Sequence, residues 1–507
     1  MSSLFAGFEH IGASKEAEKD GQAESESAPS AKGDFIHGPV AATSMSKIRA
    51  SATRTIVKSL YNFPVESFNE RMREELTLTP KGGGDKPPPP YEAFIRRGPW
   101  ICAPRFWGLA VFSEPMEDRL ADGAKVDLTF SAGLRDYQVP AVDAVMTRLR
   151  AAGTAANGAM LVAGCGTGKT VMSIAAACAL GRKTAILCHN SMLITQWAER
   201  VHEFVGESPG VVQRDRVEHD RPIVLFMIAS VISGRYDGTG IFDDFGLVIV
   251  DECHHIAAKT FMDSLSRFPA RARLGLTATP DRRDGLGKAV EWLLGPVVYT
   301  VKRRPNAEVQ VKMLRHARGP TKELHRYGKP DFVAMVTRSV RDHERTMAIC
   351  RLARQLFTEG RRVIVLSGRK DHLREMHEAL GEELSGLYVG ETSKKAKRAR
   401  EDSKDKPIML ATNNMGEEGL DVPILSALIL ATPKSSLGGI EQAVGRVLRS
   451  HPEKLHAPLI VDVWDPVGMF EGMMRKRERY FKAQGFAISH ADLEYDDCGP
   501  QEADCVT

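Results

Sequence analysis

Residues 163–170 read Ala-Gly-Cys-Gly-Thr-Gly-Lys-Thr and lie between the apolar run AMLVA (159–163) and the helical pattern KTVMSIAAACALG (169–181). A strand, a glycine-rich loop and a helix in this order are typical of a loop that binds nucleotide phosphates, because glycines let backbone N–H groups converge on them. The helix N-terminus adds a favourable dipole. Ala163 stands where the full pattern has glycine, but the GxGKT part is intact. The residues expected to bind phosphate are Gly164, Cys165, Gly166, Thr167, Gly168, Lys169 and Thr170, with the Thr170 hydroxyl also holding Mg²⁺.

This loop belongs to the first of two blocks in which short apolar runs alternate with helix-length amphipathic stretches. Continuous apolar runs of this length predict buried parallel strands. Two such blocks predict an α/β protein with two parallel-sheet domains in tandem. The predicted strands are 159–163, 184–189, 223–229, 247–251 and 274–279 in the first block, and 362–368, 408–413, 427–433 and 459–463 in the second.

Composition divides the rest of the chain. Residues 1–50 are rich in Ser, Ala, Glu and Lys and predict a disordered tail, because too little apolar surface is available to offset chain entropy. The aromatic residues between 51 and 130 predict a small accessory domain packed on the domain after it. The predicted division is a tail at 1–50, the accessory domain at 51–130, the first ATP-binding domain at 131–300, a linker at 301–330, the second domain at 331–487 and an acidic tail at 488–507.

The overall composition excludes several classes of protein. The chain has 507 residues, with 69 Lys and Arg against 65 Asp and Glu, so its formal net charge of +4 does not by itself indicate a nucleic-acid partner. No apolar run approaches the roughly 18 residues that cross a bilayer. The start of the chain lacks the pattern of a secretory signal. The eight cysteines include no CxxC pair, which favours reduced thiols in an intracellular compartment over disulfides or zinc.

A pair of carboxylates follows the strand predicted at 247–251. Asp251 and Glu252 lie at its carboxyl end, where ligands collect in open α/β sheets. There Asp251 is expected to bind Mg²⁺ and Glu252 to polarise an attacking water. Taken alone, the pair also fits a solvated helix start. Consecutive Cys253, His254 and His255 cannot all converge on one metal ion, and no second cluster completes a zinc site.

A basic helical stretch, QAVGRVLR (442–449), lies in the second block. Gln442, Arg446 and Arg449 fall on one helix face, at positions i, i+4 and i+7. Arginines presented to a γ-phosphate from a second domain suit phosphoryl transfer, because the transition-state charge lies on the transferred oxygens. A basic solvated helix is the alternative that would be favoured without the nucleotide loop.

The order of these segments resembles that of superfamily-two helicases and translocases. Within that superfamily, the Cys165 loop, the pair Gln196 and Trp197, and the DExH box resemble the XPB/UvsW-like branch. That branch includes the transcript-release helicases of poxviruses and related helicases of large DNA viruses. In chain order the matching segments are LRDYQ, GCGTGKT, ILCHNSMLITQW, DECH, LGLTATP, VIVLSGR, ATNNMGEEGLDVP and QAVGRVLR, over about 320 residues.

The resemblance implies two RecA-like domains and assigns roles to individual residues. Gln138 would read the adenine of ATP, and Arg446 and Arg449 would be the arginine fingers, with Gln442 beside them. His254 would couple hydrolysis to motion. Thr277 and Thr279 would link the two domains, and Gly419 and Asp421 would contact nucleotide from the second domain.

A nucleic-acid track across both domains is also implied, gripped mainly through phosphates and therefore of low sequence specificity. The candidate contacts follow predicted strands and are Asn190, Ser191, Ser230, Thr412 and Asn413. The basic runs 302–304, 394–400 and 475–477 add further candidates. Each also fits a solvated face, and the run that begins with Lys394 and Lys395 is preferred because it lies at a loop position in the second domain.

These observations predict an ATP-dependent helicase, with the family implying DNA and movement from 3′ to 5′. One alternative is a double-strand translocase or transcript-release factor that does not unwind processively. Another is a binding module in which nucleotide only gates attachment, which the presence of Lys169, Glu252 and Arg446 speaks against.

The expected partners are nucleic acid, DNA or RNA, with transcription or repair machinery. The expected setting is intracellular and non-membrane, as for a viral protein that acts in the host cell or is packaged in the virion.

Overall fold

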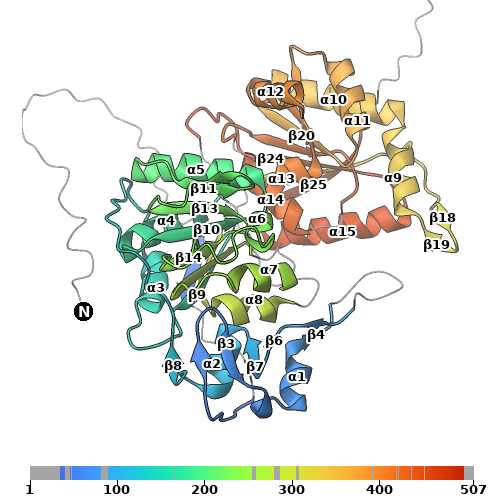
Figure 1. Cartoon of the computed structure of the whole chain (residues 1–507). Helices are drawn as coiled ribbons and strands as arrows, with labels where there is room; N and C mark the ends of the chain where they lie inside the picture. The colour runs from blue at the N-terminus through green and yellow to red at the C-terminus, as the bar shows by residue number, and fades with distance from the viewer. Residues whose placement is uncertain are drawn as a thin grey trace, which may run out of the picture. The chain divides into compact units, whose positions relative to one another are not determined.

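A computed structural model describes residues 35–39, 46, 48–80, 89–164, 166–253, 258–278, 286–303, 308–390, 393–417, 420, 422–434, 437–449 and 451–495. Two parallel-sheet lobes, preceded by a smaller N-terminal sheet, follow one another along this part of the chain (Figure 1). Within the described residues, no helix combines the length and the apolar character needed to cross a membrane.

The first lobe is built on a nine-stranded sheet whose central strands are parallel. Side chains alternate between its two faces, so that Ile186 packs on one face while Ala185 and Leu187 pack on the other. In sheet order the strands are β1 (Phe35–Pro39), β16 (Val297–Arg303), β9 (Gly158–Ala163), β15 (Ala272–Thr277), β14 (Leu247–Val250), β10 (Thr184–Cys188), β13 (Ile223–Met227), β11 (Gly210–Gln213) and β12 (Arg216–Val217).

Two groups of helices cover this sheet. The first group packs on the face that holds Ile186, and it consists of α3 (Val139–Leu149), α4 (Lys169–Leu180) and α5 (Ser191–Val205). The second group packs on the other face and consists of α6 (Ile228–Ile232), α7 (Ala258–Leu265) and α8 (Gly287–Leu294). Gly181 and Gly206 end α4 and α5 in the left-handed conformation, as expected of a glycine after a helix.

The second lobe is built on a seven-stranded, all-parallel sheet, also covered on both faces (Figure 1). In sheet order its strands are β21 (Ser385–Tyr388), β22 (Ile408–Thr412), β20 (Val363–Ser367), β23 (Ala427–Leu430), β24 (Leu459–Trp464), β17 (Gln310–Arg315) and β25 (Ala487–Asp492). One face packs against α14 (Leu437–Val447) and α15 (Gly468–Ala483), and the other against α10 (His343–Thr358) and α11 (Lys370–Leu380). The remaining elements are α9 (Phe332–Val340), α12 (Lys394–Asp402), the short 3-10 helix η2 (Ser403–Asp405), α13 (Asn413–Glu417) and the hairpin β18 (His325–Arg326) and β19 (Lys329–Pro330).

A five-stranded sheet precedes the first lobe in the sequence and shares its core. Leu60 and Cys102 of this N-terminal part pack in the core of the first lobe, while Trp292 of α8 packs into the N-terminal core. Its elements are β6 (Ile95–Arg97), β7 (Trp100–Ala103), β3 (Tyr61–Pro64), β2 (Ile56–Val57), β8 (Glu117–Asp118), the pair β4 (Thr77–Leu78) and β5 (Tyr91–Glu92), and the helices α1 (Glu70–Leu76) and α2 (Arg105–Phe112).

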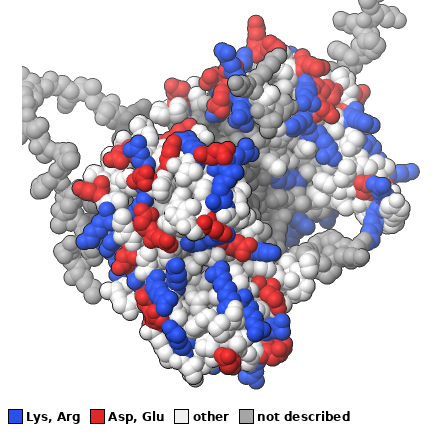
Figure 2. All heavy atoms as spheres, in the orientation of Figure 1, with Lys and Arg blue, Asp and Glu red and all other residues white. Residues whose placement is uncertain are grey.

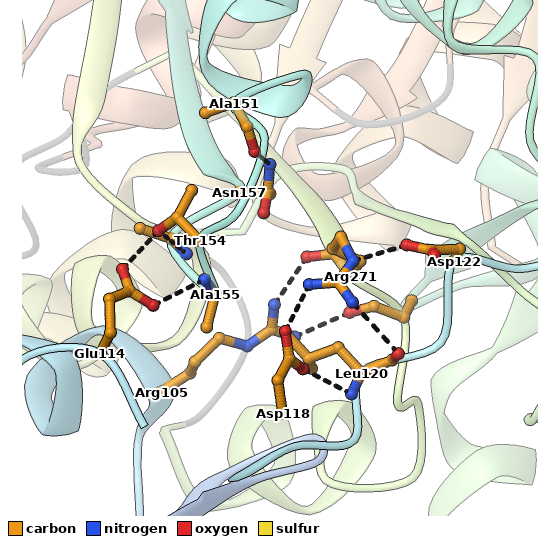
Figure 3. Close-up of polar contacts among 12 residues, drawn as sticks. Arg105, Glu114, Asp118, Leu120, Asp122, Ala151, Thr154, Ala155, Asn157 and Arg271 are labelled. Atoms are coloured by element: carbon orange, nitrogen blue, oxygen red, sulfur yellow. Dashed lines mark hydrogen bonds and ion pairs between the residues drawn. The ribbon is translucent and has the colours of Figure 1, made fainter. Parts of the chain in front are cut away.

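Buried and surface arginines fix this junction (Figure 3). The Arg105 guanidinium, which is fully buried, donates hydrogen bonds to the carbonyl oxygens of Arg271 and Ala270, at 2.7 and 2.8 Å. Arg271 in turn bridges Asp118 and Asp122, at 2.6 and 2.5 Å. A buried cation is tolerated only when it is hydrogen-bonded, so these contacts hold the N-terminal sheet in one position on the first lobe.

The structure corrects three of the predicted boundaries. β1 pairs with β16 although residues 35–39 were expected in the tail. β17 lies inside the second sheet, between β24 and β25, although residues 310–315 were expected in a linker. β25 forms an edge of that sheet although the acidic tail was expected to begin at 488. The predicted buried strands of both blocks are all present, and each begins or ends within about two residues of its expected position.

Candidate functional site

The glycine-rich loop joins β9 to α4 as predicted. Gly166 and Gly168 have positive φ values of 78° and 84°, a conformation that glycine adopts at little cost. A side chain at Gly168 would also place its Cβ only 2.4 Å from the Gln138 amide nitrogen. The Lys169 ammonium, at the start of α4, donates a hydrogen bond to the Ala163 carbonyl at 3.1 Å. The loop therefore has a backbone conformation that favours glycine at both positions.

Gln138 lies against this loop. Its side-chain oxygen accepts from the Arg135 backbone N–H at 3.0 Å, and its amide nitrogen donates to the Thr167 carbonyl at 3.0 Å. The Tyr137 hydroxyl donates to the same carbonyl at 3.1 Å. Tyr137 did not figure among the predicted site residues, although it stands next to Gln138 in the quoted segment LRDYQ.

The two carboxylates Asp251 and Glu252 follow β14 and lie beside the loop. Glu252 has a φ of 44°, which is unusual for a residue other than glycine. In this conformation its carboxylate lies 3.4 Å from the Lys169 ammonium. The Glu252 backbone N–H donates to the Asp251 carboxylate at 2.8 Å. The structure thus brings together the lysine and both carboxylates that the sequence predicted.

Trp197 on α5 reaches the same carboxylate from the other side. Its indole N–H donates to Asp251 Oδ2 at 2.9 Å, and both side chains are buried. The sequence marked Trp197 only as part of a resemblance and gave it no role. An indole N–H can only donate, and a carboxylate oxygen can accept from it. This hydrogen bond therefore suits Trp197 to a positioning role, in which it holds the Asp251 carboxylate in place.

Burial, and after it the neighbouring Glu252 charge, raise the pKa of Asp251 to about 6, while Lys169 and the Trp197 hydrogen bond act in the opposite direction. The carboxylate form is therefore costly in these surroundings. A cation next to Asp251 would favour that form, because opposite charge lowers a carboxyl pKa.

The turn that carries these carboxylates is tied to the next strand. The Cys253 backbone N–H donates to the Leu276 carbonyl at 3.1 Å, and Thr277, which ends β15, is buried. One backbone hydrogen bond thus joins the turn that carries the carboxylates to the strand that ends at Thr277.

The side chains and backbone N–H groups of this site fit Mg²⁺ and a nucleoside triphosphate. Carboxylate and hydroxyl oxygens are the ligands that Mg²⁺ prefers, and Asp251 and Thr170 supply them. The raised pKa of Asp251 marks a buried carboxylate that lacks full charge compensation. Lys169 and the loop N–H groups suit the phosphates.

Replacing Trp197 by phenylalanine should lower the apparent affinity for Mg²⁺ about tenfold, since residues that orient a metal ligand typically contribute this much. The ring remains but Asp251 loses its indole donor. Magnesium titration of nucleotide binding measures the effect. The control is Trp292→Phe, which removes an equally buried indole on α8. Equal magnesium affinity in both folded variants would refute the positioning role.

Magnesium-dependent nucleotide binding should weaken as the pH falls through the Asp251 pKa of about 6. Below this pKa the carboxyl is protonated and cannot bind a cation, so the affinity should drop about fourfold between about pH 7.5 and about pH 5.5. Calorimetric titration of Mg²⁺ with ADP at these pH values tests this. An unchanged affinity would contradict the proposed ligand role.

Three predicted nucleic-acid contacts of the first lobe lie close to the end of β11. Ser191 accepts a hydrogen bond from the Gln213 side chain at 3.0 Å, and the Ser230 hydroxyl accepts from the Arg214 backbone N–H at 2.9 Å. Asn190 caps α5 by accepting from the Leu193 N–H at 2.8 Å. Their polar groups therefore also support local structure.

The second lobe contains a pocket of about 640 Å³. Its polar walls are loops at the carboxyl ends of β20, β21, β22 and β23, the sheet edge at which open α/β folds bind ligands. Two predicted contacts, Thr412 and Asn413, lie in it. The lining residues are Phe332, Val336, Gly368, Arg369, Lys370, Gly390, Thr412, Asn413, Asn414, Met415, Thr432, Pro433 and Lys434. Three of them are cationic and none is acidic, which suits a polyanion. Sequence reasoning missed the cations, although Arg369 and Lys370 directly follow the predicted strand at 362–368.

The arginine helix of the second lobe is shorter than predicted. Gln442 is buried and Arg446 half-buried on α14. α14 ends at Val447, so Arg449 lies in the turn beyond it, where it donates to the Leu420 carbonyl at 3.3 Å. The expectation that all three residues share one helix is therefore wrong for Arg449, because the chain leaves the helix two residues earlier.

Some predicted site residues lie outside the described part of the chain. These are Cys165, His254, Thr279, Gly419 and Asp421. Lys394 and Lys395 begin α12, but their side chains are likewise outside the residues that the structure describes.

The chain matches known protein families over both lobes. Residues 131–282 match the model described as type III restriction enzyme, res subunit, and residues 345–451 match that of the helicase conserved C-terminal domain. A protein of Acanthamoeba polyphaga mimivirus, assigned as an ATP-dependent RNA helicase, is 29% identical over 413 residues, which cover 78% of this chain and 77% of that protein. The XPB helicase/translocase subunit of the general transcription and DNA repair factor IIH of Schizosaccharomyces pombe is 26% identical over 196 residues, covering 36% of this chain and 24% of that protein.

A solved structure is similar over both lobes. Saccharomyces cerevisiae Dbp5 bound to RNA and ADP BeF3 matches with a TM-score of 0.51 and 13% identity, covering 71% of this chain and 95% of that chain. At this identity the likeness shows the fold, a tandem pair of RecA-like domains.

Proposed function

The chain belongs to the superfamily-two helicases, as an ATP-hydrolysing member related to the viral and XPB-like enzymes, and from this premise we propose that it moves along one strand of DNA from 3′ to 5′. The observation that carries the proposal is the cationic pocket of the second lobe, with Thr412 and Asn413 among its walls. The choice of DNA and of direction rests on the resemblance of the sequence segments to the XPB/UvsW-like branch.

In the proposed mechanism, Lys169 binds the β- and γ-phosphates of ATP, and Asp251 and Thr170 would hold Mg²⁺. When bound, the ion neutralises charge on the phosphate oxygens. Glu252 accepts a proton from the attacking water as the water oxygen bonds to the γ-phosphorus, while the bond from that phosphorus to the bridging oxygen breaks and ADP leaves with the oxygen. Before the substrate phosphates engage Lys169, its ammonium forms an ion pair with the Glu252 carboxylate at 3.4 Å.

Arg446 is proposed to reach the γ-phosphate from the second lobe, with Gln442 supporting it and Arg449 contributing from the adjacent turn. Closure of the lobes on ATP and opening after hydrolysis would alternate the grip on the strand. The proposed phosphate contacts in the second lobe are Arg369, Lys370 and Lys434, which line the pocket. Lys370 is held in place by a hydrogen bond from its ammonium to the Gly390 carbonyl at 2.9 Å.

Strand displacement tests this function. The protein should unwind a partial DNA duplex with a 3′ single-stranded tail in the presence of ATP and Mg²⁺, and should fail on a duplex with a 5′ tail. A parallel assay measures displacement of the third strand from a triplex. Triplex displacement without unwinding would replace the proposed helicase by a double-strand translocase.

A further inference from the structure

A two-residue hairpin turn at the edge of the second lobe carries the most exposed large hydrophobic side chain of the described chain. β18 and β19 pair in the register His325 to Pro330 and Arg326 to Lys329, which leaves Tyr327 and Gly328 as the turn. Tyr327 is 92% exposed. Figure 1 shows the hairpin at the outer edge of the lobe, where α9 begins.

The backbone of this turn makes the tyrosine unexpected. Tyr327 and Gly328 have φ values of 53° and 75°, as a type I′ turn requires. Such turns favour Asn-Gly or Asp-Gly, and a bulky residue in the left-handed region is an outlier. Neither packing nor turn geometry therefore accounts for an aromatic ring at this position.

One cation lies beside the ring and a second lies across the hairpin from it. The Arg326 guanidinium carbon lies 5.5 Å from the centroid of the Tyr327 ring, and Lys329 pairs with Arg326 across the hairpin. All residues from 325 to 330 are exposed, and none of them is acidic. Figure 2 shows Lys and Arg side chains along the edge of the molecule where Figure 1 places β18 and β19.

Hydrogen bonds join the base of the hairpin to the rest of the lobe. The Glu323 carboxylate accepts from the Met469 N–H at 2.6 Å, and the Asp331 N–H donates to the Leu324 carbonyl at 2.7 Å. The Asp331 side chain caps α9 through the Ala334 N–H at 3.0 Å. The two acidic residues that flank the hairpin are thus engaged at its base, where Glu323 also lies 3.6 Å from the His325 imidazole, and residues 325–330 include no acidic side chain.

The hairpin leads directly into the wall of the cationic pocket. Phe332, two residues after β19 ends, and Val336 line the pocket together with Arg369 and Lys370. Tyr327 lies five residues before Phe332, so even a fully extended chain places the tip no more than about 17 Å from this wall. A strand held in the pocket by its phosphates would therefore reach the ring within a few nucleotides.

We propose that Tyr327 stacks on an unpaired base of the nucleic-acid strand next to the second-lobe pocket, while Arg326 and Lys329 contact the adjoining phosphates. This inference rests on the proposed function. Every base offers a flat π-face, so an exposed aromatic flanked by cations binds single strands without reading their sequence. A partner protein with an aliphatic surface would gain nothing from Arg326 and Lys329 beside the ring. The charge pattern therefore favours a nucleic-acid strand as the partner.

The test is equilibrium binding of a fluorescent oligothymidylate of about 20 nucleotides to the full chain without ATP. Tyr327→Asn keeps a residue suited to the turn but removes the ring, and should weaken binding about tenfold, as loss of one stacked base does. Tyr327→Phe should bind as the unsubstituted protein does. The matched control is Leu455→Ala, another exposed apolar side chain of the second lobe, 83% exposed, which should change nothing.

Further measurements separate stacking from misfolding and from failure of the proposed function. ATPase activity without nucleic acid should be equal in all variants, because Tyr327 is not part of the nucleotide site. Thermal stability of Tyr327→Asn should not fall, since asparagine tolerates the left-handed region. Unchanged binding by Tyr327→Asn, or equal weakening by Tyr327→Phe, would overturn the stacking role and leave the proposed function standing. No binding by the unsubstituted protein would overturn both.

Discussion

The Glu252→Gln variant should bind ATP as tightly as the unsubstituted protein and hydrolyse it at least a hundredfold more slowly, the effect typical of losing a general base. The amide keeps the size of the carboxylate but cannot take the proton from water. It also loses its attraction to the Lys169 ammonium, 3.4 Å away, which frees that lysine for phosphate. Phosphate release measured under saturating ATP, beside binding of a fluorescent ATP analogue, gives both quantities.

Two further variants make this result specific. Lys169→Ala should lose nucleotide binding as well as turnover, because the phosphates lose their cation. Glu203→Gln removes an exposed carboxylate that pairs with Arg200 on α5, and it should leave both quantities unchanged. Substantial turnover by Glu252→Gln, with ATP bound and the fold intact, would mean that another group activates the water.

Arg446→Ala should reduce turnover about a thousandfold with only a modest loss of nucleotide affinity, the range seen when an arginine finger is removed. The guanidinium is proposed to act on charge that develops during transfer of the phosphoryl group and not on bound ATP. Single-turnover hydrolysis with saturating single-stranded DNA measures the chemical step and separates it from product release.

The control for this variant is Arg354→Ala. Arg354 is exposed on α10 of the same lobe, and α10 packs on the opposite face of the sheet from α14, so the substitution changes the lobe's charge equally at a distant place. An unchanged rate in Arg446→Ala would mean that the second lobe does not deliver this arginine to the γ-phosphate. The roles given to Gln442 and Arg449 would then fail with it.

The parts of the fold that the sequence predicted are those with a strong hydrophobic signal. The runs at 159–163 and 247–251 became β9 and β14 because strands covered on both faces are apolar throughout. The missed strands lack this signal. β25 lies at a sheet edge with most of its side chains exposed, so it is held mainly by backbone pairing with β17. β17 mixes exposed and buried residues, so it contains no continuous apolar run that would predict a strand.

The same limit applies to the site. Lys169, Asp251 and Glu252 could be predicted because each belongs to a local pattern with fixed spacing. The hydrogen bond from Trp197 to Asp251 joins residues 54 positions apart and depends on how α5 packs on the sheet. The burial of Arg105 likewise follows from the docking of the N-terminal sheet, which no local pattern encodes. Long-range contacts of this kind require the folded structure.

Streptavidin displacement from single-stranded DNA measures the proposed ATP-driven movement from 3′ to 5′ without the complication of duplex unwinding. Two oligonucleotides of about 60 residues carry biotin at either the 3′ or the 5′ end, and free biotin traps released streptavidin. We expect release from the 5′ end only, requiring ATP and Mg²⁺ and absent in Glu252→Gln. Release from the 3′ end, or ATP hydrolysis stimulated by DNA without release from either end, would contradict the proposed movement.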